Sequence, residues 1–293
     1  MVIGTAKQRP AATPPADRST GTLPVAVADG VGDERAPAQS ERPGLPPARL
    51  LFIVPAFNEQ EALPAVVGDL GAHFPAADIV VVNDGSADGT AAVARSLGVH
   101  LLDLPYNVGI GGCVQTGLLF AARHGYDVAV QFAGDGQHRA DQVVALLAAL
   151  AAGNDAAIGS RFLAAGGYRP PLGRRLGMAL LRRANALALR RPVTDSTSGF
   201  RAYGRETIAF LAEEYPHDYP EPESLVTLCR NGFRVVEVAV SMRHRQAGAS
   251  SITAVRSIYY IYKVLLAIAV GATRRPTRRP SDGPAHPDRL DPR

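Results

Sequence analysis

The chain has 293 residues, of which 46% are apolar and 20% charged, and its formal net charge is +4. This length and apolar content suffice for one sizeable folded domain or two small ones, and they exclude a chain disordered throughout. Cys113 and Cys229 stand apart without C-x-x-C spacing, which favours a reducing, cytoplasmic compartment over a disulfide framework. A nucleic-acid-binding protein is disfavoured, because the central region has no Lys-rich stripe with interleaved aromatic residues.

Both ends of the chain differ from its middle. Residues 1–48 are rich in Pro, Ala, Thr and Asp without apolar periodicity, so we predict a disordered segment rather than a secretory signal. Residues 256–272 are apolar but short for a transmembrane helix, and either a core helix or a membrane-interfacial helix fits them. Residues 273–293 form a basic, Pro-rich tail, predicted to be disordered and either simply solvated or attracted to an anionic membrane surface.

Between these ends, apolar runs alternate with helical patterns. Buried strands are predicted in "ARLLFIVPAFN", "ADIVVVNDGS", "VHLLDLP", "YDVAVQFAGD" and "DAAIGSRF", and a helix follows each of the first four. This alternation predicts an α/β domain over residues 49–255, with a parallel sheet covered by helices on both faces. The second half is less regular: we expect an Arg-rich helix at 172–191, a loop in "VTDSTSGFRAYGRE", an irregular "YPHDYPEPE", a helix in "SLVTLCRNG" and a strand in "FRVVEVAVSMRHR".

Polar residues gather where the predicted strands end. In parallel sheets, ligands bind outside the carboxyl ends of the strands. The sequence therefore predicts a ligand site formed by the residues at these ends, which are Asn58, Glu59, Asp84, Asn107, Asp135 and Arg161.

The motifs "IVPAFNE", "VVVNDGSADGT", "NVGIGGCVQTG", "GDGQH", "IGSRF", "STSGFRAY" and "MRHRQAGASS" follow one another over about residues 50–253. In this order and spacing they resemble the inverting glycosyltransferases of family 2, most of all the branch of dolichol- and polyprenyl-phosphate mannose or glucose synthases. The resemblance implies the GT-A nucleotide-sugar-binding fold, with a mostly parallel central sheet. It also implies a nucleotide-diphosphate sugar donor, Mg²⁺ or Mn²⁺, and a polyprenyl phosphate or cell-surface glycan acceptor at the inner face of the cell membrane.

For the donor, the resemblance implies a base near Pro55, Phe57 and Val82, with hydrogen bonds to Glu59 and Asp84. Simpler roles stay open for both acids, because Glu59 could favour a helix start and Asp84 could cap the turn "DGSADG". The glycines of the "NVGIGG" and "GDGQH" loops would let the backbone approach the ligand. Arginines would bind the donor phosphates through paired hydrogen bonds, although an ion pair is the alternative for the first of them. These further residues are Gly109, Gly112, Gly134, Arg161 and Arg245.

The "GDGQH" motif departs from the family pattern. Related sequences carry Asp-x-Asp here, and the two carboxylates hold the cation, but this chain has Ala133 at the first position. By match, Asp135 is the metal-contacting Asp and Gln137 an accessory ligand. Because such cations also take waters and substrate phosphates as ligands, we expect a weakened site rather than none. A nucleotide-sugar-binding pseudoenzyme or partner subunit is the alternative.

The resemblance implies catalytic roles for Asp135, Glu223 and Arg201. On the acceptor side, Ser198, Gly199 and Arg201 would line the site. Glu223 would act as a base on a hydroxyl acceptor or orient it, its alternative role being a helix cap. A polyprenyl phosphate is already anionic and needs arginines more than a base. Other residues bear on this side: Asp218 and Glu221 as neighbouring acids, Arg174 and Arg175 as possible phosphate ligands, and Ser196 and Ser251 as departures from the usual Pro and Lys.

Two other enzyme classes fit less well. A Gly-x-Gly-Gly pattern before a helix is typical of dinucleotide-binding dehydrogenases, but "LPYN" separates these glycines from the strand. A metal-dependent nucleotidyltransferase normally has a Gly-rich loop with Lys or Arg after its first strand, and "VPAFNEQEA" lacks one.

Overall fold

The computed structural model describes residues 48–163, 183–184, 186–187, 189, 192–217, 219–243, 263, 265–266 and 277. The segments predicted to be disordered, 1–48 and 273–293, and the apolar segment 256–272 lie almost wholly outside these residues. The arginines predicted for the phosphates, Arg245, Arg174 and Arg175, also lie outside them, as do Asp218 and Ser251, the residue at the position of the usual Lys.

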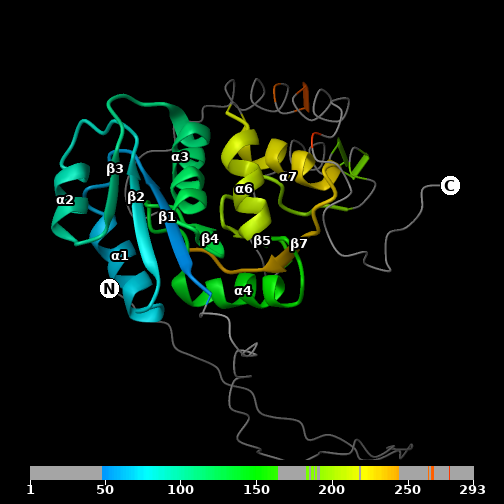
Figure 1. Cartoon of the computed structure of the whole chain (residues 1–293), viewed down its shortest axis with the longest axis horizontal. Coiled ribbons are helices and arrows are strands. Elements are labelled where there is room, and N and C mark those ends of the chain that lie inside the picture. The colour runs from blue at the N-terminus through cyan, green and yellow to red at the C-terminus, as the bar shows by residue number, and fades with distance from the viewer. Residues whose placement is uncertain are drawn as a thin grey trace, which may run out of the picture. The chain divides into compact units, whose positions relative to one another are not determined.

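In the described part of the chain, seven strands form one sheet in the order β3-β2-β1-β4-β6-β5-β7 (Figure 1). The antiparallel pairings of β6 with β4 and β5 make it run against the other six strands. The mostly parallel sheet predicted from the sequence is therefore confirmed. The strands are β1 (Leu50–Ala56), β2 (Asp78–Asn83), β3 (His100–Asp103), β4 (Val128–Gln131), β5 (Ala156–Ser160), β6 (Arg201–Gly204) and β7 (Val235–Ala239).

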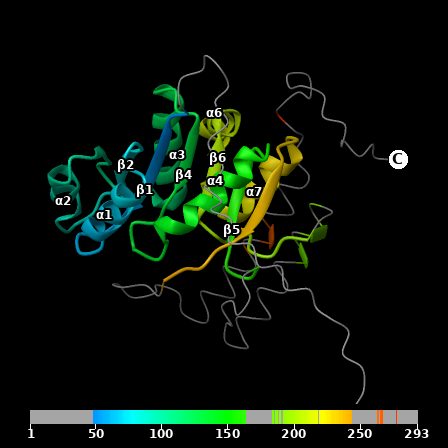
Figure 2. The ribbon, with the colours of Figure 1, turned by 90° about the horizontal axis from the view of Figure 1, so that it is seen from below.

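Helices cover both faces of this sheet (Figures 1 and 2). Alternate residues of β1 show the division: Phe52 packs with α1 and α4, whereas Ile53 packs with α3, α6 and α7. Both faces of the strand are thus buried, which explains its continuous apolar sequence. The helices are α1 (Leu63–His73), α2 (Thr90–Ser96) and α4 (Val143–Ala151), which pack on one face, and α3 (Gly109–Arg123), α6 (Arg205–Glu214) and α7 (Pro220–Arg230), which pack on the other.

The second half of the domain differs from the sequence prediction in two places. The predicted loop "VTDSTSGFRAYGRE" contains β6, a four-residue strand whose partners β4 and β5 are distant in sequence, so no local pattern announces it. The "PEPE" residues, predicted to be irregular, form the first turn of α7. Pro220 takes the first helical position, where a missing N–H costs nothing, and acidic residues follow it in the first turn.

The loops after β1 and β2 are joined by hydrogen bonds at the carboxyl edge of the sheet. Asn58, with φ of 56°, donates its backbone N–H to Ser86 Oγ at 2.9 Å and accepts from the Ala87 N–H at 2.9 Å. Asparagine tolerates this left-handed backbone better than most residues. At Gly85, with φ of 65°, a Cβ would lie 2.6 Å from the backbone carbon of Tyr106, so the third loop packs closely as well. These loops form one wall of the site described next.

Candidate active site

Two adjoining pockets lie at the carboxyl edge of the sheet and share Pro55, Ile110 and Ala133 in their walls. The larger has a volume of about 330 Å³ and the smaller about 190 Å³. Of the predicted site residues, the larger pocket brings together Pro55, Phe57, Glu59, Asp84, Gly109, Gly134 and Asp135. The smaller pocket is lined by Gln131, Gln137, His138, Arg161, Thr197, Ser198, Gly199, Glu221 and Met242 in addition to the shared residues.

The larger pocket contains most of the residues predicted to bind the donor. Phe57 at its edge is 47% exposed, which leaves an aromatic surface available to a ligand. Asp84 accepts the backbone N–H groups of Val108 at 2.7 Å and Gly109 at 3.1 Å, so its carboxylate also holds the start of α3 in place. Val82, by contrast, is completely buried in the core and lines neither pocket.

The turn from Ala133 to Gln137 separates the two pockets. The Asp135 carboxylate accepts the Gln137 N–H at 3.0 Å, and Gly136 has a φ of 74°, as this tight turn requires. Gly134 lies against β1, where a Cβ would come within 2.9 Å of the Pro55 carbonyl oxygen. Asp135 lines the larger pocket and Gln137 the smaller, so residues of this one turn contribute to both.

The described residues contain no group of three His, Cys, Asp or Glu side chains that could hold a metal ion. The Asp135 carboxylate and the side-chain oxygen of Gln137 are hard ligands of the kind that Mg²⁺ and Mn²⁺ prefer. Such a cation keeps waters and substrate phosphates in its coordination shell. These residues therefore fit a cation that binds together with a diphosphate, and they do not form a complete site alone.

His138 fixes the other end of this turn. Its Nδ1 accepts the Ala133 N–H at 2.9 Å, and its ring stacks on Phe200 with the ring centres 4.6 Å apart. Burial lowers the pKa of His138 to about 3, and the nearby Arg161 charge contributes in the same direction. The imidazole is thus neutral, and because Nδ1 accepts a hydrogen bond, Nε2 carries the proton. Sequence reasoning did not select His138, although "GDGQH" contains it.

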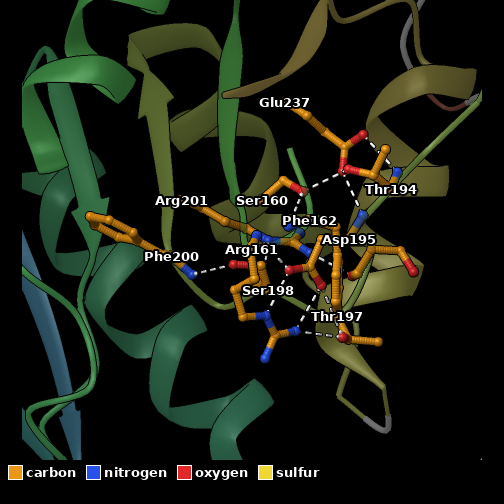
Figure 3. Close-up of polar contacts among 11 residues, drawn as sticks. Ser160, Arg161, Phe162, Thr194, Asp195, Thr197, Ser198, Phe200, Arg201 and Glu237 are labelled. Carbon is orange, nitrogen blue, oxygen red and sulfur yellow. Dashed lines mark hydrogen bonds and ion pairs between the residues drawn. The ribbon is translucent and has the colours of Figure 1, made fainter. Parts of the chain in front are cut away.

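Arg161 binds a buried carboxylate at the smaller pocket (Figure 3). Its Nε and one terminal nitrogen each donate to Asp195 at 2.7 Å, and the same nitrogen reaches Thr197 Oγ1 at 3.0 Å. Asp195 is held in turn by Glu237 of β7, which accepts the Asp195 N–H at 2.6 Å. Arg161 thus forms the ion pair named as its alternative role, but its partner is a buried acid and not a surface one. Arg161 also lines the smaller pocket.

Arg201 and Glu223, both predicted to be catalytic, do not line either pocket. Arg201 is 1% exposed and donates to the carbonyl oxygens of Ser196, Ser198 and Glu221 and to Ser224 Oγ. Glu223 accepts the Tyr219 N–H at 3.2 Å, which is the helix-capping role named as its alternative.

Glu221 lies in the smaller pocket instead. Because residues two apart on a helix point about 200° away from each other, the pocket can receive only one of Glu221 and Glu223. The sequence pattern did not predict that α7 begins at Pro220, so it could not show which of the two acids faces the pocket.

Comparison with solved structures identifies the fold. Glucosyl-3-phosphoglycerate synthase from Mycobacterium tuberculosis, crystallised with Mn²⁺, uridine diphosphate and phosphoglyceric acid, superposes with a TM-score of 0.59. The identity is 20%, and the match covers 78% of this chain and 79% of that one. The present fold is thus the GT-A fold predicted from the motifs.

Sequence comparison identifies the family. Residues 51–210, more than half of the chain, match the glycosyl transferase family 2, and the chain belongs to this family. Polyprenol monophosphomannose synthase of Mycolicibacterium smegmatis is 35% identical over 237 residues, covering 76% of this chain and 89% of that protein. Undecaprenyl-phosphate mannosyltransferase of Micrococcus luteus is 32% identical over 222 residues, covering 70% and 88%. The branch indicated by the motifs is therefore confirmed.

Proposed function

We propose that the protein transfers a sugar from a nucleotide-diphosphate sugar to a polyprenyl phosphate, with inversion at the sugar's C1. The observation that carries this proposal is the pair of adjoining pockets with the Asp135–Gln137 turn between them. Such an arrangement fits a nucleotide on one side of a diphosphate and a sugar on the other. The names of the two relatives support a polyprenyl phosphate rather than a glycan as the acceptor.

The larger pocket suits the nucleoside diphosphate. Phe57 offers a face for a base, Glu59 an acceptor for hydroxyl groups, and Asp135 lies where the diphosphate would enter. A divalent cation held by Asp135 and Gln137 would neutralise the charge that develops on the leaving diphosphate. Neutralisation of this charge is the main contribution that such a site makes to the transfer.

The acceptor phosphate needs little activation. A phosphate oxygen attacks C1, the bond from C1 to the diphosphate breaks, and its electron pair leaves with the nucleoside diphosphate. Since the attacking oxygen is already anionic, no side chain must remove a proton from it, unlike a glycan hydroxyl.

We also propose that the protein works at the inner face of the cell membrane, because a polyprenyl phosphate is a lipid. No helix in the described residues is long and apolar enough to cross a membrane. The apolar segment 256–272 and the basic tail 273–293 are the candidates for contact with the lipid surface.

The test is transfer of radiolabelled sugar from GDP-mannose, UDP-glucose or UDP-N-acetylglucosamine into the organic phase with undecaprenyl phosphate present. We expect one donor to label the lipid, to require the polyprenyl phosphate and Mg²⁺ or Mn²⁺, and to fail with Asp135→Ala. Binding of a nucleotide sugar without transfer from any donor would contradict the proposal. In that case, activity gained by Ala133→Asp would favour the pseudoenzyme.

A further inference from the structure

The smaller pocket contains a carboxylate that other side chains leave without a partner. Glu221 lines the pocket from the first turn of α7, and within the described residues its carboxylate forms no ion pair and no hydrogen bond to another residue. The charges of Arg201 and Arg161 are close enough to act on this carboxylate, but the hydrogen bonds of both arginines go to other groups. Arg201 donates to the backbone oxygen of Glu221 at 2.7 Å, and Arg161 is directed at Asp195.

Glu221 is partly buried and turns towards the smaller pocket. Desolvation raises the pKa of Glu221 above its usual value, although the charges of Arg201 and Arg161 and the residue's own backbone N–H act in the opposite direction. Because no other described side chain donates a hydrogen bond to this carboxylate, a ligand in the pocket is free to do so.

Gln131 faces the same space from the other side. It lies at the end of β4, is 3% exposed, and accepts a hydrogen bond from the Tyr203 hydroxyl at 3.3 Å through Oε1. Its Nε2 lies 3.3 Å from the point that a Cβ on Gly199 would occupy, and Glu221 Oε1 lies 3.8 Å from that same point. An amide donor and a carboxylate acceptor thus converge beside Gly199.

A glycine at position 199 is explained by the space around it and not by its backbone conformation. It is not among the glycines with positive φ, so its backbone suits other residues. A side chain here would occupy the region between Gln131 and Glu221. The glycine therefore keeps this end of the pocket open.

The size and polarity of the pocket select the ligand. A cavity of roughly 150 Å³ admits a six-membered ring such as benzene, and this pocket has about 190 Å³. Of the two charged residues that line this pocket, Arg161 is already paired with Asp195, so Glu221 disfavours a phosphate here. Sugar hydroxyl groups, by contrast, donate strong, charge-assisted hydrogen bonds to a carboxylate. The pocket also adjoins the larger one at Ala133, so a sugar attached to a nucleotide could reach it.

We propose that Glu221 and Gln131 bind hydroxyl groups of the donor sugar, and that Gly199 leaves the room for its ring. These residues then determine which sugar is transferred. The inference deepens the proposed function, since it rests on a nucleotide-sugar donor, but it concerns binding of the donor and not the acceptor.

The test compares, by calorimetry with Mn²⁺, the affinity for the nucleotide sugar with the affinity for the nucleoside diphosphate alone. Glu221→Gln should weaken binding of the nucleotide sugar roughly 10- to 100-fold, the usual loss for a hydrogen bond to a charged group, and leave the diphosphate within about twofold. Gly199→Ala should show the same selectivity. The matched controls are Glu213→Gln, which changes an exposed acid on α6, and Gly71→Ala, whose added Cβ meets no atom within 4 Å. Neither control should change the ratio of the affinity for the nucleotide sugar to the affinity for the nucleoside diphosphate.

If Glu221→Gln and Gly199→Ala both keep the wild-type ratio of the two affinities, the proposed sugar-binding role of these residues is wrong. An equal loss for both ligands would also overturn it, because the effect would then not be on the sugar. Slower sugar transfer by Glu221→Gln with normal donor binding would indicate that Glu221 acts as a base, and would also reject the sugar-binding role. Selective loss of sugar binding in a protein that transfers nothing to undecaprenyl phosphate would uphold this inference while rejecting the proposed function.

Discussion

Acidification should destabilise the protein through His138. The folded-state pKa of this residue is about 3, whereas the ordinary value of 6.5 applies to the unfolded chain. Between these values the unfolded chain binds the proton and the folded protein does not, so stability is full above pH 6.5 and is lost as the pH falls. At about 1.4 kcal/mol per pH unit, lowering the pH to 5 should cost about 2 kcal/mol from this one group.

Urea unfolding at pH 7.5 and pH 5, with wild type and His138→Asn, measures this loss. Asparagine cannot titrate, and its side-chain oxygen can replace Nδ1 as the acceptor for the Ala133 N–H. All other ionisable groups are common to both proteins, so the difference between the two pH-dependent losses isolates His138. We expect wild type to lose about 2 kcal/mol more than the variant. Losses that agree within about 0.5 kcal/mol would refute a neutral, buried His138.

Four further substitutions test the site and the loops around it. Asp195→Ala removes the buried partner of Arg161 and should lower the free energy of unfolding by about 3 to 5 kcal/mol in urea titrations, whereas a loss under about 1 kcal/mol would mean that the pair contributes little. Gly85→Ala forces a Cβ against a neighbouring backbone carbon at positive φ and should cost more than about 1 kcal/mol; an unchanged melting temperature would contradict this. Asp135→Ala should abolish cation-dependent binding of the nucleoside diphosphate and Ala133→Asp should strengthen it, as calorimetry with and without chelator would show; wild-type binding that ignores the cation would reject the metal role.

The sequence was most informative for the first half of the fold. Apolar runs such as "LLFIVPA" and "DIVVVN" are buried on both faces of the sheet, so their composition alone marks them as inner strands. Strand β6 was missed because its stability comes from two distant partners. Its buried Arg201 looks like a surface or ligand-binding residue in the sequence, and only the acceptors that surround it in the fold explain it.

The order and spacing of short motifs determined the family and the edge of the sheet at which the two pockets lie, because these depend on which residues follow each strand. Only the tertiary structure shows in which direction the side chains of the second half of the domain point. Whether Glu221 or Glu223 points into the pocket depends on where α7 begins, and whether Arg161 meets a carboxylate depends on Glu237 of β7 holding the chain at Asp195. These side-chain directions arise from contacts between residues far apart in sequence, and no local pattern of residues encodes them.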